Sequence, residues 1–147
     1  MGEKVSDEIT IDAGMVTIWN VITDIDAYPD WTDGVEETEI LSTTDEGYPL
    51  QAYFRVDAKV SEVTYTIEYR YDDHDVRWHL VEGEMLSQLD GAYELTETDG
   101  GTRVRYSLEV DVDLPVPGFM KKRAARTILE QGLSGLKARA ETAEQQG

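Results

Sequence analysis

The last long stretch of the chain, from Pro117 to about Ala143, constrains the fold most. On a helical wheel one side is small and aliphatic, and it carries Ala125, Ile128, Leu129, Gly132, Leu136, Ala140 and Ala143. The other side is mostly charged, and it carries Lys122, Arg123, Arg126, Glu130, Lys137, Glu141 and Glu144. This pattern predicts a long amphipathic helix. Because an isolated helix gains little stability in water, the rest of the chain must cover the apolar stripe.

Two glycines, Gly132 and Gly135, lie within this predicted helix. A glycine inside a helix costs about 1 kcal/mol relative to alanine. One interpretation is that the helix packs closely on a sheet, where only small residues fit. The other is that the small residues leave room for a ligand between helix and sheet. Both interpretations are open from the residues alone.

The middle of the chain alternates between apolar and polar residues, and short turn sequences separate the alternating segments. The predicted strands are 5–11, 35–43, 49–57, 60–72, 75–82, 86–97 and 102–113. The predicted breaks are 45–47, 57–59, 72–75, 82–84 and 99–101. Short breaks between neighbouring strands are typical of antiparallel hairpins. No helix-length segment separates the strands from residue 35 onward, so a parallel sheet is not expected.

Two short helical segments are predicted after the first strand. From Gly14 to Asp24 apolar residues recur at helical intervals, and Asp12 is a fair N-cap for this segment. The second segment covers 24–31 and ends at Trp31. We expect Trp31 to lie in the core or in the wall of a pocket.

Each predicted strand has one apolar face and one polar face, which is typical of an antiparallel sheet covered on one side only. The apolar face is rich in aromatic residues and carries Tyr65, Tyr69, Tyr71, Trp78, Tyr93 and Tyr106. A buried tyrosine needs a partner for its hydroxyl group. Several tyrosines on one concave face indicate a cavity that is apolar with a few polar points. The alternative is that tyrosines near strand ends reach solvent.

The formal net charge of −18 argues against nucleic acid as a partner, because phosphate contacts need clustered Lys and Arg. The one basic cluster is Lys121, Lys122, Arg123 and Arg126, and acidic loops of the same chain are its expected neighbours, ahead of an anionic partner. The 147 residues predict one domain over 1–147, without disulfides because cysteine is absent. The polar N-terminus and the lack of a long apolar run predict a cytoplasmic protein.

Several phrases of the sequence resemble the polyketide cyclase/dehydrase branch of the START-like (SRPBCC) superfamily. They are VITDIDAYPDW at 21–31, VDAKV at 56–60, YRYDD at 69–73, WHLVEG at 78–83, LDGAYEL at 89–95, GTRVRYSLEVD at 101–111 and LPVPGFMKKRA at 114–124. The resemblance implies an α+β helix-grip fold. In that fold a curved, seven-stranded antiparallel sheet wraps around a long C-terminal helix, with two short helices after the first strand. It also implies a ligand cavity between sheet and helix.

The resulting ligand-binding candidates are Trp31, Phe54, Tyr65, Tyr69, Trp78, Tyr93, Tyr106, Phe119, Met120, Ile128 and Gly132. Relatives that cyclise polyketides use pocket tyrosines and an arginine. Here Arg55, Arg70, Arg77, Arg103 and Arg105 all fall in the polar register of their strands, so a cyclase mechanism lacks its cation. Tyr65, Tyr93 and Tyr106 are weak catalytic candidates, since a tyrosine with a pKa near 10 is a poor general base. His74 and His79 are expected at the surface, and no metal or cofactor site is predicted.

The first functional hypothesis is binding or transport of a hydrophobic small molecule such as a lipid, a quinone or a polyketide-like aromatic. The alternative is a polyketide cyclase, aromatase or dehydratase that acts in the same cavity. An interaction module with only a residual cavity is a third possibility. The segment 114–120 is expected either to staple the core closed or to cover the cavity mouth. With 121–123 beside it, this segment is also a candidate for contact with a membrane or a carrier protein. Either a monomer or a homodimer fits an exposed sheet edge.

Overall fold

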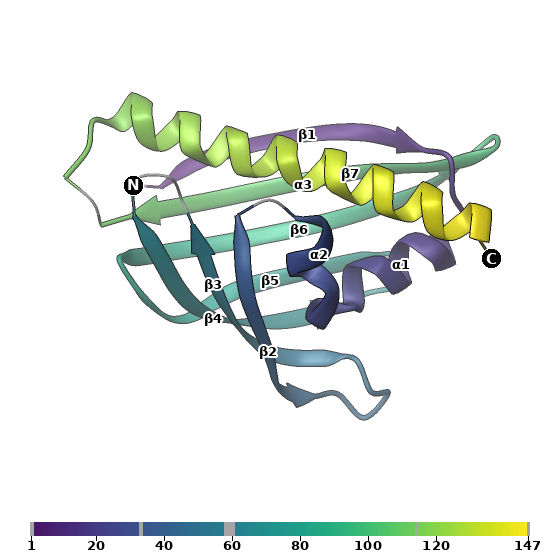
Figure 1. Cartoon of the computed structure of the whole chain (residues 1–147), viewed down its shortest axis with the longest axis horizontal. Helices are drawn as coiled ribbons and strands as arrows, with labels where there is room; N and C mark the ends of the chain where they lie inside the picture. The colour runs from purple at the N-terminus through teal and green to yellow at the C-terminus, as the bar shows by residue number, and fades with distance from the viewer. Residues whose placement is uncertain (1, 33, 58–60, 114, 147) are drawn as a thin grey trace.

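The computed structural model describes residues 2–32, 34–57, 61–113 and 115–146. Its strands form one antiparallel sheet in the order β1-β7-β6-β5-β4-β3-β2, curved around the long helix α3 (Figure 1). The strands are β1 Glu3–Ile11, β2 Val35–Thr43, β3 Pro49–Asp57, β4 Glu62–Tyr71, β5 Asp75–Glu84, β6 Leu86–Thr98 and β7 Gly101–Val112. The expected helix-grip arrangement is confirmed. The predicted turn at 57–59 and the start of the 114–120 segment fall partly on residues outside the described ranges.

Two short helices follow β1, as the sequence predicted: α1 Met15–Thr23 and α2 Tyr28–Trp31, joined by the single turn η1 Ile25–Ala27. The assignment of Asp12 as the N-cap of α1 was wrong. Gly14 occupies the cap position and, as a glycine, has no side chain that could cap the helix. The carboxylate that serves this helix end comes from the other end of the chain, from Glu144 in α3.

One predicted break lies elsewhere in the structure. The sequence placed a turn at 82–84, but β5 continues to Glu84 and the chain reverses around Met85, which has a positive φ of 65°. Gly83 lies inside the strand opposite Tyr65. A Cβ on Gly83 would lie 3.3 Å from the Cβ of Tyr65, so this glycine accommodates close side-chain packing instead of a turn. Gly47 and Gly100 do lie at predicted turns, with φ of 92° and 89°.

Helix α3, Gly118–Gln146, packs mainly against β1, α1 and β7. Its buried residues are Ala125, Leu129, Gly132, Leu133, Leu136 and Ala140, so the predicted apolar stripe is the face that meets the sheet. None of the residues from 118 to 124 is buried. The C-terminal part of the helix therefore closes the core, whereas its first two turns lie against little of the protein.

Two carboxylates fasten the C-terminal part of α3 to the junction between β1 and α1. Glu144 accepts hydrogen bonds from the Gly14 N–H at 2.7 Å and from the Thr17 hydroxyl at 2.9 Å. Glu141 accepts one from the Asp12 N–H at 2.9 Å and pairs with Lys137 at 2.6 Å. The Glu144 carboxylate also lies at the positive end of the α1 dipole. We call these two residues the carboxylate clamp.

The bonds of the clamp favour the ionised carboxylates. The Lys137 ammonium and then the Asp12 N–H lower the pKa of Glu141 below its ordinary value. The Gly14 N–H and then the Thr17 hydroxyl lower the pKa of Glu144. A carboxyl group whose pKa is lowered by folding stabilises the fold above its unfolded pKa of about 4.3. This stabilisation is lost as the pH falls through the folded pKa.

We predict that the double variant E141Q/E144Q melts at a lower temperature than the natural protein at neutral pH, with a difference that shrinks as the pH falls below about 4. Thermal melts followed by circular dichroism across this range measure it. The control E39Q/E97Q removes the same charge at two exposed strand positions. Equal losses in both double variants, or a difference that does not change with pH, would contradict the role of the clamp.

Candidate ligand cavity between the sheet and the last helix

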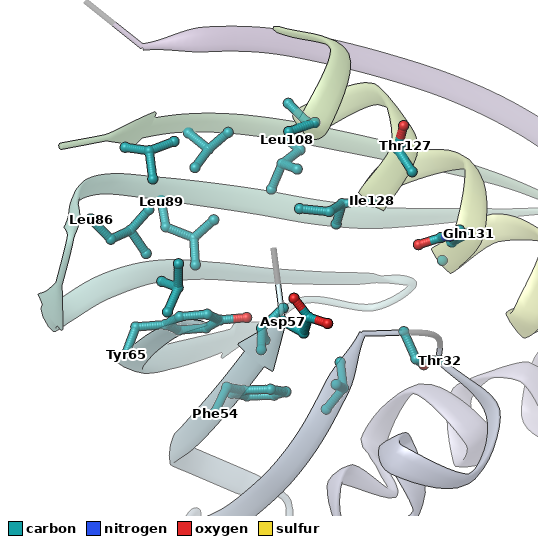
Figure 2. A pocket seen from close by; sticks show the side chains of 18 of the residues that line it. Thr32, Phe54, Asp57, Tyr65, Leu86, Leu89, Leu108, Thr127, Ile128 and Gln131 are labelled. Atoms are coloured by element: carbon teal, nitrogen blue, oxygen red, sulfur yellow. The ribbon is translucent and has the colours of Figure 1, made fainter. Parts of the chain in front are cut away.

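A cavity of about 330 Å³ lies between the inner face of the sheet and the N-terminal half of α3. Leu86, Leu89 and Leu108 line it from β6 and β7, Phe54 and Tyr65 lie across it on β3 and β4, and Ile128 covers it from α3 (Figure 2). The strands supply these residues because their alternate side chains point inward. The result is a space enclosed largely by hydrocarbon and aromatic rings.

Most of the predicted ligand-binding residues line this cavity: Phe54, Tyr65, Tyr69, Trp78, Tyr93, Tyr106, Met120, Ile128 and Gly132. Trp31 and Phe119 do not. Trp31 lies beside it, with its ring 4.9 Å from that of Tyr28, and borders a separate shallow recess with Gln131 and Gly135. The Phe119 side chain is 66% exposed at the start of α3. Whether the lining residues bind a ligand stays a prediction.

The aromatic lining is continuous. Trp78 lies over Gly91 on the neighbouring strand, and a Cβ on that glycine would fall 2.3 Å from the indole ring. From there the indole contacts Tyr93 at 5.4 Å and Tyr106 at 5.9 Å between ring centroids. Tyr93 and Tyr106 are themselves 4.6 Å apart. Gly91 thus lets a large ring lie flat on the sheet, which fixes the position of the tyrosines next to it.

The tyrosine hydroxyls fall into two groups. Tyr28 donates to the Ile22 carbonyl and Tyr71 to the Pro49 carbonyl, both at 2.5 Å. Among the described residues, by contrast, the hydroxyls of Tyr65, Tyr69, Tyr93 and Tyr106 have no hydrogen-bond partner. Tyr69, Tyr93 and Tyr106 are only 5% to 7% exposed and all four line the cavity. Their donors are therefore available to a molecule inside it.

Burial keeps these tyrosines protonated. Loss of hydration raises the pKa of Tyr69 and Tyr93 well above the ordinary value, and repulsion from neighbouring phenolates adds to the shift. The same cause raises the pKa of Tyr65 and of Tyr106. At neutral pH the four groups are hydrogen-bond donors and poor bases. The cavity can therefore orient or polarise a carbonyl or hydroxyl group more readily than it can remove a proton.

The strand arginines lie on the outer face, as the sequence predicted. Arg55 pairs with Glu36, Glu37 and Glu62 at 3.2 to 3.4 Å. Arg77 pairs with Asp75 and Glu94, and Arg105 lies 3.8 Å from Glu94. His74 and His79 are exposed too. No strand arginine of the described chain points into the cavity.

Two cations at the start of α3, Lys121 and Arg123, border the cavity. The sequence placed them beside the segment expected at the cavity mouth, but did not identify them as cavity-lining residues. No ion pair joins Lys121, Lys122, Arg123 or Arg126 to an acidic side chain within the part of the chain that the structure describes. The expectation that acidic loops of the same chain lie near this cluster stays a prediction. Met120, Ala124 and Ile128 recur at helical spacing along one edge of α3, and Lys121 lies on the same edge. This spacing could have identified Lys121 as a cavity residue from the sequence.

The sequence gave little indication that several other residues line the cavity. Tyr28 lines the cavity from α2, although the YPDW sequence suggested only the end of a helix. Thr32, Asp57, Thr127 and Gln131 add polar groups. Asp57 ends β3, and the alternation of that strand assigned it to the outer face. Asp57 nonetheless borders the cavity, at the end of the strand.

The two helix glycines answer the question raised by the sequence. A Cβ on Gly135 would lie 2.5 Å from the carbonyl oxygen of Trp31, so Gly135 allows α2 to approach α3 closely. A Cβ on Gly132 would lie 2.9 Å from the Tyr106 ring, and Gly132 also lines the cavity. Gly135 therefore serves close packing against α2, and Gly132 serves packing and also leaves space.

Two further properties bear on the kind of site this is. Within the described ranges, no three His, Asp or Glu side chains are grouped so that they could hold a metal ion. No helix among those residues is long and apolar enough to cross a membrane.

The sequence profile of the family described as "Polyketide cyclase / dehydrase and lipid transport" matches residues 3–141. A START superfamily protein from Mycobacterium smegmatis is 26% identical with a TM-score of 0.88, and the match covers 97% of this chain and 99% of that one.

Two other solved structures show the same fold at lower identity. The Zhui aromatase/cyclase from Streptomyces sp. R1128 is 16% identical with a TM-score of 0.80, over 96% of this chain and 94% of that one. A STAR-related lipid transfer protein from Xanthomonas axonopodis is 16% identical with a TM-score of 0.72, over 93% and 85%. An enzyme and a lipid carrier thus share this fold.

We predict that Tyr69, Tyr93 and Tyr106 do not ionise with ordinary tyrosines at about pH 10 while the protein is folded. Because the unfolded chain loses these protons first, stability is full below about pH 10 and falls as the pH rises further. In a pH titration, the near-ultraviolet absorbance of tyrosinate from these residues should increase only above about pH 10. It should increase together with the unfolding that circular dichroism detects. The protein in concentrated guanidinium, where all tyrosines titrate together, is the control. If all tyrosines ionised near pH 10 while the protein stayed folded, the buried positions of Tyr69, Tyr93 and Tyr106 would be contradicted.

Proposed function

The chain belongs to the polyketide cyclase / dehydrase and lipid transport family, and from this premise we propose that it binds a hydrophobic small molecule between its sheet and α3. The observation that supports this most is the set of tyrosine hydroxyls that have no partner among the described residues and face an otherwise apolar cavity. A core that only held the fold together would fill this space with side chains.

The size and lining of the cavity suit such a ligand. Its volume of about 330 Å³ is at the lower end of the range of about 300–1,000 Å³ for small-molecule sites. Burial of apolar ligand surface contributes roughly 25 cal/mol per Å². Leu86, Leu89, Val110 and Phe54 supply that surface, and the hydroxyls of Tyr69, Tyr93 and Tyr106 fix the orientation of the ligand.

The first experiment is native mass spectrometry of the protein purified from its own host, with organic extraction and identification of anything bound. A stoichiometric apolar molecule is the expected result. Binding of N-phenyl-naphthylamine, an uncharged dye that fluoresces in apolar surroundings, is the companion assay for the protein freed of ligand. If the purified protein carries no bound molecule and the ligand-free protein does not bind the dye, the proposal has no support.

We predict that G132L lowers dye affinity by about tenfold, because the leucine side chain enters the cavity against the Tyr106 ring. The control S134L adds the same side chain at an exposed position two residues away on α3. The second variant A124L adds bulk to the lining without a glycine replacement. Circular dichroism establishes that each variant is folded. Undiminished affinity in folded G132L and A124L would refute the location of the site.

A second candidate function is turnover in the same cavity, of the cyclase, aromatase or dehydratase type. The closeness of several protonated tyrosines supports it, since such donors stabilise the charge that develops on a carbonyl oxygen. We expect Y65F, Y93F or Y106F to reduce turnover of a poly-β-keto substrate by about tenfold or more while binding persists. Full turnover in all three variants would rule out these roles.

Contact of the segment 114–123, which includes the first residues of α3, with a membrane or a carrier protein stays a prediction. Phe119 and Met120, which are 66% and 38% exposed, lie beside Lys121 and Arg123 at the cavity. A ligand that enters or leaves by this side passes apolar side chains first.

A further inference from the structure

The first two turns of α3 bring two cations to the edge of the cavity. Lys121 and Arg123 both line it, and Lys121 is partly buried there. Neither side chain has a hydrogen bond or an ion pair within the part of the chain that the structure describes. A positive group at a cavity edge without an acidic partner is free to pair with an anion that enters from outside.

The acidic residues near this edge do not neutralise the two cations. Asp57 is the only acidic residue among the described lining residues, and it has an interaction of its own that involves neither cation. Glu3 lies near the start of α3, with its Oε1 atom 3.8 Å from the position of a Cβ on Gly118, but it does not line the cavity. The net charge of −18 acts at longer range, and physiological salt largely screens charges more than about 8 Å apart. The unpaired charges that border the cavity are therefore positive.

The two cations begin two rows of lining residues along α3. Arg123, Thr127 and Gln131 follow one another at intervals of four residues, so they share one polar edge of the helix. The second row runs from Lys121 to Ile128 and is apolar after its first residue. Figure 2 shows Thr127, Ile128 and Gln131 on the turns of α3 that border the cavity. Both cations therefore lie at the same end of the cavity, where α3 begins.

Further along α3 the cavity offers hydrocarbon and then hydroxyl groups. The Tyr93 hydroxyl lies 3.8 Å from the position of a Cβ on Gly132. Gly132 follows Arg123 by nine residues, which is about 14 Å along the helix axis. Ile128 lies between them on α3, and apolar side chains of β6 and β7 line the sheet below it (Figure 2). An amphipathic molecule that lies along α3 would therefore meet positive charge at one end only.

We propose that the ligand of this cavity is an amphipathic anion whose carboxylate or phosphate group binds at Lys121 and Arg123. Its apolar body lies along the hydrocarbon lining below α3, toward Tyr93. Ammonium and guanidinium groups only donate hydrogen bonds, and the oxygens of an ionised carboxylate or phosphate accept them, so the two sides match. The positive end of the α3 dipole lies at the same place and adds to the attraction. This inference rests on the proposed function and names the ligand class for that cavity.

Four ligands with the same decyl chain test the proposal: decanoate, decyl phosphate, decanol and decylamine. Each is titrated at neutral pH into the ligand-free protein with N-phenyl-naphthylamine bound, and displacement of the dye gives its affinity. At least one of the two anions is expected to bind about tenfold more tightly than decylamine, because the cations attract the anion and repel the amine. The tighter of the two anions identifies the head group as carboxylate or phosphate. Added salt is expected to reduce the difference.

The double variant K121Q/R123Q removes both cations from the cavity edge. It is expected to lower the ratio of anion affinity to decanol affinity by about tenfold. The matched control K122Q/R126Q removes two positive charges from exposed positions of the same helix that do not line the cavity. Because the control changes the net charge equally, it is expected to alter the ratio by less than about twofold. Circular dichroism establishes that both variants are folded.

The outcomes separate this inference from the proposed function. If decanol displaces the dye but neither anion binds more tightly than decylamine, the anion site is wrong and the apolar cavity stands. The same holds if K121Q/R123Q lowers the ratio no more than K122Q/R126Q does. If K121Q/R123Q weakens binding to phosphatidylglycerol vesicles but leaves the ratio unchanged, the cations serve a membrane surface and the inference is again wrong. If the dye binds and none of the four ligands displaces it, this inference alone fails, and if the dye does not bind either, both proposals fail.

Discussion

The apolar face of the sheet must be covered, and α3 covers only part of it closely. From Ala125 to Ala140 the helix inserts its stripe into the core, and the carboxylate clamp fastens this part to the β1–α1 junction. The turns before Ala125 have no such attachment, and their residues Met120, Lys121, Arg123 and Ala124 border the cavity instead. The cavity follows from this difference between the two parts of one helix. Packing of the C-terminal part stabilises the fold, and the N-terminal part borders the cavity.

The same burial that stabilises the aromatic core decides what chemistry it can perform. Rings from five strands meet beneath α3, and their removal from water raises the pKa of the buried tyrosines. A carboxylate or an imidazole near them would provide a base, but the inner face of the described strands offers none apart from Asp57 at its edge. The site is therefore suited to binding, and any turnover in it would depend on proton donation to a substrate oxygen.

Most of the fold was predictable because strict alternation fixes both the strands and their inward faces. Val104, Tyr106 and Leu108 are buried, and Arg103 and Arg105 are exposed, as their pattern predicted. The pattern fails where local rules give way to contacts across the chain. Gly83 resembled a turn residue, but it makes room for Tyr65 within the sheet.

The site was less predictable, since neighbours that are distant in sequence decide it. Glu144 serves a helix end some 130 residues away, which no spacing rule detects. Trp31 and Phe119 are large aromatic residues of the kind that line pockets. In the structure Trp31 packs on Tyr28 beside Gly135, whereas Phe119 faces solvent. Asp57 borders the cavity from the end of β3, and Lys121 and Gln131 border it from the edge of the apolar stripe of α3. At such positions the strand and helix patterns do not decide which way a side chain faces.

The tyrosine hydroxyls give the strongest reason to regard the cavity as functional. Phenylalanine at positions 69, 93 and 106 would keep the ring contacts of Trp78 and would leave no hydroxyl to satisfy. Replacing a buried polar group by an apolar one of the same shape is often neutral or stabilising. Stability alone therefore gives no reason for the hydroxyls. A molecule in the cavity that accepts their hydrogen bonds does.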